Sequence, residues 1–191
     1  MILSDGAIVD ALAVGDVVVN PSVPAGSVRG LGIRLHLGAT LLVPVPTDGE
    51  IDLAYPKECQ FTKYTMDGQG YVLHAHDYVL ASTAERVATS RSLACLIDGR
   101  SSIARQGLFV HCSSMVFDSV HEGARVVVLE LFNCSRRSIR LRPGLPIAML
   151  AFLRLERPIL QAAAPQYADQ QSTLPPRPME RADEGATDEP I

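Results

Sequence analysis

Residues 98–133 read DGRSSIARQGLFVHCSSMVFDSVHEGARVVVLELFN and contain two patterns that decide the predicted fold and function. The first is a polar segment, Asp98–Arg105, in which a glycine precedes an arginine and two serines. Its amides, hydroxyls and guanidinium groups are donors suited to phosphate oxygens. The second is an apolar run, Val126–Phe132, which is typical of a buried strand and carries one carboxylate, Glu130. Together they predict an anion-binding loop and an acid/base group.

Glu130 has two interpretations. A carboxylate in a buried strand must be paired or protonated, and Arg105 is a fixed cation available to pair with it across a pocket. Alternatively, the strand lies at the edge of a sheet and Glu130 points to water, which periodicity alone does not exclude. The presence of Arg105 favours the first interpretation.

The whole chain has the composition of an ordinary soluble globular protein. It has 191 residues, of which 47% are hydrophobic and 20% charged, and this length suits one domain with a sizeable core. The net charge of −4 argues against nucleic acid as a partner. No apolar run reaches the roughly 18 residues of a membrane span, and no cleavable leader precedes Ser4. We therefore expect no membrane partner and a cytoplasmic location.

No zinc site is expected. The four cysteines lack a C-x-x-C spacing and are expected to be buried reduced thiols; they are Cys59, Cys95, Cys112 and Cys134. His74 and His76 would share one face of a strand, which is a metal-binding spacing. No third histidine or cysteine is nearby in the sequence, so a polar turn before Tyr78 is the preferred interpretation.

Short strands dominate the predicted secondary structure. A helix is expected from Ser4–Asp5 to about Gly15, with Ile8, Ala11 and Leu12 on its buried face. The expected strands are 17–19, 31–37, 41–45, 71–73, 78–82, 93–97, 126–132, 138–142 and 147–155, and residues 51–70 are expected to be irregular. Many short strands with almost no helix predict an all-β barrel or sandwich.

Three segments make the chain similar to the dCTP deaminases of the dUTPase-like superfamily. They are 98–108 (DGRSSIARQGL), 128–133 (VLELFN) and 141–152 (LRPGLPIAMLAF). The opening MILSD and the segment 78–85 (YVLASTAE) also resemble that family. The resemblance covers residues 1 to about 171. It implies a mainly-β fold, a distorted β-barrel with a short N-terminal helix, and a homotrimer whose active sites are shared between subunits.

The same resemblance implies hydrolytic deamination of dCTP, or of a closely related cytosine deoxynucleotide, to dUTP and ammonia. Glu130 would be the general base and acid, Ser101 would hold the attacking water, and Arg105 would orient Glu130. The H-x-E and P-C-x-x-C motifs of zinc deaminases do not occur in the sequence, so no protein-bound metal is expected. Mg²⁺ would bind only through the triphosphate of the substrate.

The resemblance also assigns the substrate-binding residues. Arg100 and Ser102 would bind phosphate, and Asp118 would bind the 3′-hydroxyl of the deoxyribose. Ser113 and Ser114 would lie beside the base. Without the resemblance, each serine reads as a loop hydroxyl that bonds its own backbone, and Asp118 as a turn former.

The C-terminal part of the chain changes character. Residues 166–171 (QYADQQ) resemble the family segment that folds over the bound triphosphate, with Tyr167 and Gln170 as binding residues. Residues 172–191 are rich in proline and acidic residues and are expected to form a flexible tail. The predicted domain is therefore 1–171.

Two departures from the family keep other functions open. The segment 118–121 lacks the family's Pro-Gly turn, and Gln166 stands where the family has a lysine. A non-catalytic nucleotide-binding or scaffold homologue is thus one alternative. A dUTPase, or a bifunctional enzyme that continues to dUMP, is another. Glu130 argues against dUTPase activity alone, because it would have no role in a site that leaves the pyrimidine ring untouched.

Overall fold

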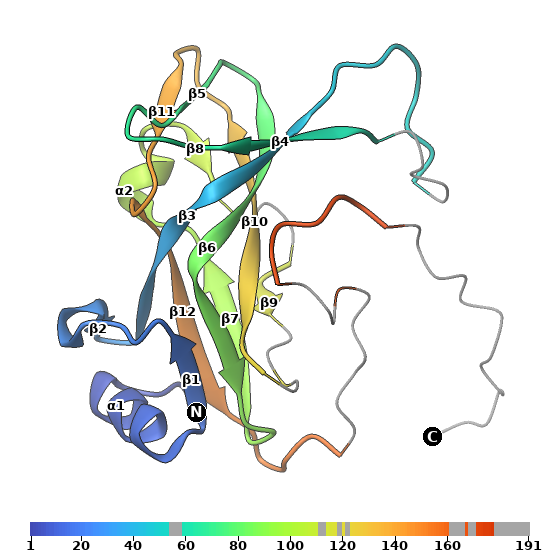
Figure 1. Ribbon diagram of the computed structural model, residues 1–191. Coiled ribbons are helices and arrows are strands. Elements are labelled where there is room, and N and C mark those ends of the chain that lie inside the picture. Colours follow the sequence, from blue (N-terminus) through green and yellow to red (C-terminus); the bar gives the residue numbers. More distant parts are fainter. Residues whose placement is uncertain are drawn as a thin grey trace, which may run out of the picture.

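Strands dominate the structure, a computed structural model that describes residues 1–53, 59–110, 114–117, 120, 123–160, 167 and 171–177 (Figure 1). The elements are, in chain order, α1 (Asp5–Val14), β1 (Val17–Asn20), the 3-10 helix η1 (Ala25–Ser27), β2 (Val28–Arg29), β3 (Gly32–Pro44), β4 (Phe61–Thr65), β5 (Tyr71–Leu73), β6 (Tyr78–Thr89), β7 (Leu93–Asp98), α2 (Ser101–Ala104), β8 (Leu108–Phe109), β9 (Val116–Phe117), β10 (Arg125–Asn133), β11 (Ile139–Leu141) and β12 (Pro146–Arg154). The predicted mainly-β fold is confirmed.

One curled sheet forms the body of the protein. Its strands follow the order β8-β10-β6-β3-β12-β7-β9, while β1 pairs with β6, and β2 and β4 pair with β3. β5 and β11 form a separate two-stranded sheet. β3 and β6, with 13 and 12 residues, lie near the middle of the order and extend along the body of the molecule (Figure 1). This arrangement agrees with the predicted distorted β-barrel.

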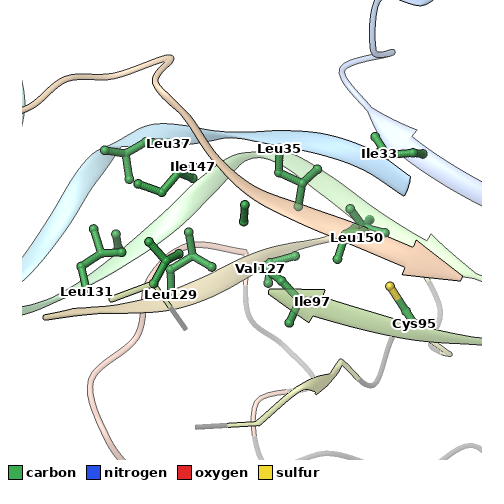
Figure 2. Packing of buried hydrophobic residues seen from close by; sticks show 14 of the residues in the cluster. Ile33, Leu35, Leu37, Cys95, Ile97, Val127, Leu129, Leu131, Ile147 and Leu150 are labelled. Carbon is green, nitrogen blue, oxygen red and sulfur yellow. The ribbon is translucent and has the colours of Figure 1, made fainter. Parts of the chain in front are cut away.

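The hydrophobic core lies inside the curl of this sheet. Figure 2 shows side chains of β3 and β12 meeting those of β7 and β10, including Leu35, Leu150, Ile97, Val127 and Leu129. In β10, buried and half-buried residues alternate from Val127 to Asn133, so one face of the strand contributes to the core and the other does not. Glu130 belongs to the face that does not.

Two irregularities, which are shifts in the register between paired strands, bend the sheet, and they lie close to each other along β6. β3 advances four positions, from Leu37 to Leu41, while its partner β6 advances two. β6 then advances four positions, from Ser82 to Arg86, while β10 advances two. Gly38 lies in the first irregularity, where an added Cβ would be 2.9 Å from the carbonyl oxygen of Ser82. Because bulges bend a strand and increase its twist, they account for the curl of the sheet.

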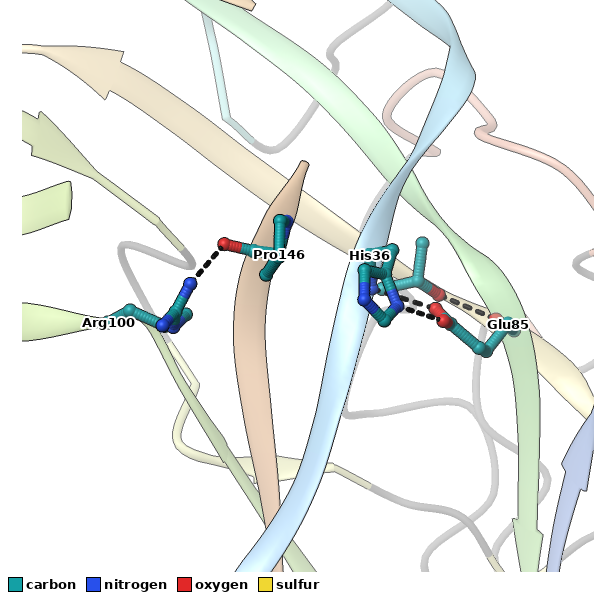
Figure 3. Close-up of polar contacts among 5 residues, drawn as sticks. His36, Glu85, Arg100 and Pro146 are labelled. Carbon is teal, nitrogen blue, oxygen red and sulfur yellow. Dashed lines mark hydrogen bonds and ion pairs between the residues drawn. The ribbon is translucent and has the colours of Figure 1, made fainter. Parts of the chain in front are cut away.

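Thr83 and Glu85 stabilise the second irregularity. The Thr83 hydroxyl donates to the Glu85 carbonyl at 2.7 Å and accepts from the Val127 N–H at 3.0 Å. Glu85 is only 5% exposed, and its carboxylate accepts from the backbone N–H of His36 at 2.9 Å. Its other oxygen lies 2.6 Å from Nδ1 of His36, as Figure 3 shows. Side chains thus replace ladder bonds that the shifted register removes.

Asn133 closes the end of β10. It is fully buried, and its Nδ2 donates to the carbonyls of Leu73, His74 and Arg137 at 3.1, 2.9 and 2.8 Å. Its Oδ1 accepts from the backbone and the hydroxyl of Ser135 at 3.0 and 2.7 Å. One side chain therefore fixes the turn before β6 and the turn after β10 together.

The N-terminal helix forms as predicted. The Ser4 hydroxyl accepts from the Ala7 N–H at 3.5 Å, and Gly15 ends the helix in the left-handed region, with φ of 80°. Ile8 and Ala11 are buried. Within the described part of the chain, no helix is long and apolar enough to cross a membrane.

Other predictions need correction. The strands expected at 31–37 and 41–45 are one strand, β3, and the segment expected to be irregular contains β4. Of the cysteines expected to be buried, Cys95 is buried and Cys59 half-buried, but Cys134 is exposed in the turn after β10. Cys112 lies outside the described residues.

Replacing Thr83 with valine tests the second irregularity. The change keeps the shape of the side chain but leaves the buried Val127 N–H without its acceptor, so we expect a loss of about 2 kcal/mol in the free energy of unfolding. Urea denaturation followed by circular dichroism measures it. The matched control is Thr62→Val on the exposed β4, expected within about 0.5 kcal/mol of the parent protein. Equal stability of the two variants would contradict the role of Thr83.

Candidate active site

The polar segment 98–105 contains a single turn of helix rather than the expected loop. In α2, Ile103 is buried, while Ser101 and Ser102 are exposed, as is Arg105 just beyond. Gly107 ends the turn with φ of 87°, and a Cβ there would lie 2.5 Å from Cβ of Ser135. The close approach fixes α2 against the turn after β10, so its hydroxyls and the Arg105 side chain face outward as one polar surface.

Arg100, directly before α2, makes a contact outside the polar segment. It is half-buried, and its Nη1 donates to the Pro146 carbonyl at 2.9 Å (Figure 3). This contact anchors the segment to the start of β12. The guanidinium keeps further donors beyond this bond, since each arginine has five N–H groups.

Glu130 lies in a cavity of about 230 Å³ on the outer face of β10. The described residues that line it are Tyr78 and Leu80 of β6, Val128 and Glu130 of β10, and Tyr167, Leu174 and Pro176. Its Oε2 is shielded from solvent. Within the described residues, β10 pairs at Glu130 only with β6, since β8 reaches no further than Phe132. The strand is therefore an edge at this point, yet its carboxylate faces a lined cavity.

Residues 167 and 171–177 cover this cavity. Arg125 is buried, and its Nη1 donates to the Tyr167 carbonyl at 3.0 Å. The Tyr167 hydroxyl accepts from the Arg177 N–H at 2.9 Å, and the Arg177 guanidinium lies 5.3 Å from the centre of the Tyr167 ring. Arg86 of β6 donates from Nη1 to Oε1 of Gln171 at 2.6 Å. We call residues 167 and 171–177 the cover segment.

The cover segment includes the first part of the predicted tail. Thr173 is only 6% exposed, and Leu174 and Pro176 line the cavity with Glu130. Residues 178–191 lie outside the described residues, so the flexible tail and the boundary of the domain stay predictions.

Within one chain, the predicted site residues do not all line one cavity. The cavity brings Glu130 and Tyr167 together, whereas none of its described lining residues comes from α2. Ser114 is exposed, and its hydroxyl donates to the Val116 carbonyl at 3.0 Å. Ser113, Asp118 and Gln170 lie outside the described residues, so their roles stay predictions.

Comparison with known proteins decides the family. A family model described as dCTP deaminase-like matches residues 2–155. The chain belongs to this family. A dCTP deaminase of Rhodospirillum rubrum is 31% identical over 190 residues, covering 93% of this chain and 96% of its own. A protein of Persephonella marina named dCTP deaminase, dUMP-forming, is 30% identical over 179 residues, covering 93% and 97%.

A solved structure supports the family's fold for this chain. The 2′-deoxycytidine 5′-triphosphate deaminase of Agrobacterium tumefaciens matches with a TM-score of 0.59 and 20% sequence identity. The match covers 79% of this chain and 47% of that chain. It therefore supports a similar fold over most of this chain.

No sequence pattern of this dCTP deaminase-like chain indicates the residues that hold the cover segment. Arg86 and Arg125 contact residues about 85 and 42 positions later in the chain, a distance that no local pattern spans. Arg125 carried one usable signal, because a cation at the start of a buried strand needs a partner, as Glu130 does.

Replacing Tyr167 with phenylalanine tests the cover segment. The variant loses the hydroxyl that accepts the Arg177 N–H but keeps the ring, so we expect the Arg177 amide to exchange with deuterium about fivefold faster. Hydrogen exchange with fragment-resolved mass spectrometry measures the rate. Tyr64→Phe on β4 is the matched control and should leave this amide unchanged. If Tyr167→Phe also left it unchanged, the hydroxyl would not hold the segment.

Proposed function

We propose that the protein catalyses the hydrolytic deamination of dCTP, giving dUTP and ammonia. The observation that carries the proposal is the carboxylate of Glu130, which faces a covered cavity from the otherwise apolar run Val126–Phe132 of β10. The relatives named dCTP deaminase support the same reaction. The cytoplasm is the proposed location, since the spacing of the four cysteines does not indicate a disulfide framework.

The reaction requires protons to move between water and the cytosine base. Water adds to C4 of the base as Glu130 takes one of its protons and passes that proton to N3. Glu130 then takes the remaining proton from the C4 hydroxyl and gives it to the exocyclic amine, which leaves as ammonia, and C4 keeps the oxygen as a carbonyl. A single carboxylate can serve as base and acid in turn, because the proton that it accepts is the one it gives back.

The active site is completed by a second subunit in this proposal. Ser101 and Arg105 are exposed on α2, and the described lining of the Glu130 cavity contains no arginine. A homotrimer would bring α2 of one subunit to the Glu130 cavity of the next. There Ser101 would hold the water, and Arg105 would orient Glu130 and stabilise the developing charge.

The triphosphate would bind to the same polar surface. Ser102 is exposed beside Ser101, and Arg100 has donors left after its bond to Pro146. Mg²⁺ would enter with the triphosphate. Tyr167 would contact the nucleotide from the cover segment, as would Gln170, and Asp118, Ser113 and Ser114 would bind the nucleoside.

A dUMP-forming activity is the second candidate. The relative in Persephonella marina carries that name, and it covers the same share of this chain as the Rhodospirillum rubrum dCTP deaminase. Such an enzyme would also hydrolyse the triphosphate to release diphosphate. Two further alternatives are a dUTPase and a non-catalytic homologue. The assay described next distinguishes both from a deaminase.

That assay incubates the full chain with dCTP and Mg²⁺ and resolves dCTP, dUTP, dUMP and ammonia over time, with dUTP as a parallel substrate. Equal amounts of dUTP and ammonia are the expected products. Formation of dUMP and diphosphate from dCTP would establish the second candidate. Turnover of dUTP alone would identify a dUTPase, and binding of dCTP without any turnover would identify the non-catalytic homologue.

Glu130→Gln tests the proton transfer. The variant keeps the shape of the side chain but removes the group that exchanges protons, so we expect ammonia release to fall at least about 100-fold. Nucleotide binding and the oligomeric state should be retained. Glu156→Gln, on an exposed position after β12, is the matched control and should keep full activity. More than a small fraction of parent turnover in Glu130→Gln would contradict its role.

Co-expression of two inactive variants tests the shared site. Arg105→Ala and Glu130→Gln are each expected to be inactive alone, but mixed trimers can combine an intact α2 with an intact Glu130. With equal expression and random assembly, about a quarter of the sites would be intact and activity should recover to that level. No recovery in mixed trimers isolated with two affinity tags would mean that each chain builds its own site.

A further inference from the structure

A second cavity lies beside the one that contains Glu130. It has a volume of about 390 Å³, within the range of small-molecule sites, roughly 300–1,000 Å³. Its lining combines the apolar Val43, Pro44 and Pro46 with Tyr71, His76 and Asp77. Tyr78 lines both cavities, so the two cavities are neighbours.

Polar groups with spare hydrogen-bonding capacity meet in this second cavity. Among the described residues, the Tyr71 hydroxyl and the His76 imidazole have no hydrogen-bond partner. Asp77 accepts from the His74 N–H through Oδ2 at 3.0 Å, which leaves Oδ1 available. A cavity with an apolar wall and a few convergent polar groups is the usual form of a ligand site.

Tyr71 keeps its proton in this environment. Burial and the nearby Asp77 carboxylate raise the pKa of the Tyr71 hydroxyl, with a smaller effect from Tyr64. The cavity therefore presents a donor, from Tyr71, and an acceptor, from Asp77, close enough to each other to interact electrostatically.

The backbone at His76 is strained in a way that favours a functional side chain. His76 has φ of 66°, in the left-handed region that glycine adopts easily and other residues rarely do. Among the described residues, no other residue except glycine has a positive φ. The His76 N–H donates to the carbonyl of the buried Asn133 at 2.8 Å, a contact that joins this turn to the end of β10. Strained residues gather at ligand sites, and this strain sits at the cavity.

The charge of the lining narrows the class of ligand. Neither lysine nor arginine occurs among the described lining residues, and the Asp77 carboxylate repels phosphate groups. The proline and tyrosine rings offer flat surfaces for a planar ring. Tyr71 and Asp77 offer one donor and one acceptor to the edge of that ring.

We propose that this second cavity binds an unphosphorylated nucleoside whose base presents a donor and an acceptor side by side, as cytosine does with its amine and ring nitrogen. The Asp77 carboxylate accepts from the exocyclic amine, and the Tyr71 hydroxyl donates to the ring nitrogen. His76 borders the bound base. Binding here does not depend on the deamination proposed at Glu130.

Titration of the full chain with cytidine, followed by the imidazole signals in proton–carbon NMR spectra, tests the proposal. The His76 signal is identified by its absence from the spectrum of His76→Gly. We expect it to shift on addition of cytidine. We expect at least about tenfold weaker binding of 2-pyrimidinone riboside, which lacks only the amine, because the Asp77 acceptor is then left unpaired.

Two variants separate this cavity from the one that contains Glu130. Asp77→Asn presents a donor in place of an acceptor and should weaken cytidine binding about tenfold, while Glu130→Gln should leave it unchanged. No shift of the His76 signal at millimolar cytidine would overturn the proposal. So would a shift that is lost in Glu130→Gln and kept in Asp77→Asn, because the ligand would then occupy the Glu130 cavity.

The stability of His76→Gly provides a check on the strain argument. Because glycine adopts the left-handed conformation freely, this variant should unfold at the same or a higher urea concentration than the parent protein. Its cytidine binding, measured by calorimetry, should nevertheless be weaker. Unchanged affinity in this folded variant would exclude His76 from the site and contradict the proposal.

Discussion

The hydroxyl of Thr83 is the interaction on which the shape of this protein depends. It lies where β6 gains residues relative to β10, and it bonds to both strands at that point. Next to it, the Glu85 carboxylate joins β6 to His36 of β3, close to the place where β3 has its own irregularity. Regularly paired strands already twist, and the extra residues at these two interruptions bend the strands further and increase the curl of the sheet. The curl turns one face of β10 toward the core and leaves Glu130 on the other.

The outward direction of Glu130 explains why the chain needs a cover. A carboxylate on a bare outer face would be fully hydrated, and water would weaken every electrostatic interaction in a reaction there. Tyr167, Leu174 and Pro176 replace much of that water with carbon and one phenol group. Arg86 and Arg125 hold this segment; Arg125 lies on β10, the strand of Glu130, and Arg86 lies on its partner strand β6. The strand pair therefore supplies the carboxylate and the anchors of its cover.

The sequence predicts the regular parts of the fold well and the interruptions badly. Apolar runs and alternation predict most strands, β10 among them, while Ser4 and Gly15 mark the ends of α1. The two strands predicted within β3 differ from the single observed one because its bulge near Gly38 breaks the period of two. The single turn of α2 is too short to give a helical period. These misses concern features that neighbouring strands determine.

The sequence likewise indicates some parts of the candidate site and not others. Residues of local motifs, such as Ser101, Ser102 and Arg105, were found from the sequence through a family resemblance. The surroundings of Glu130 were not, since they come from segments far apart in the chain and are brought together only by the curl. His76 is an intermediate case, because its spacing from His74 attracted a metal interpretation. The described residues hold no group of three or more metal-ligating side chains, and the notable property of His76 is its backbone.

The position of Tyr78 in the lining of both cavities has a practical consequence for inhibitors. A molecule that fills both would have to pass beside the Tyr78 ring, and its second half would bind at the high effective concentration that a short linker creates. Selectivity would then come from the second cavity rather than from the Glu130 cavity, since the strained turn at His76 and the two prolines shape it. Tyr78 is thus the point at which two weak ligands are best joined into one.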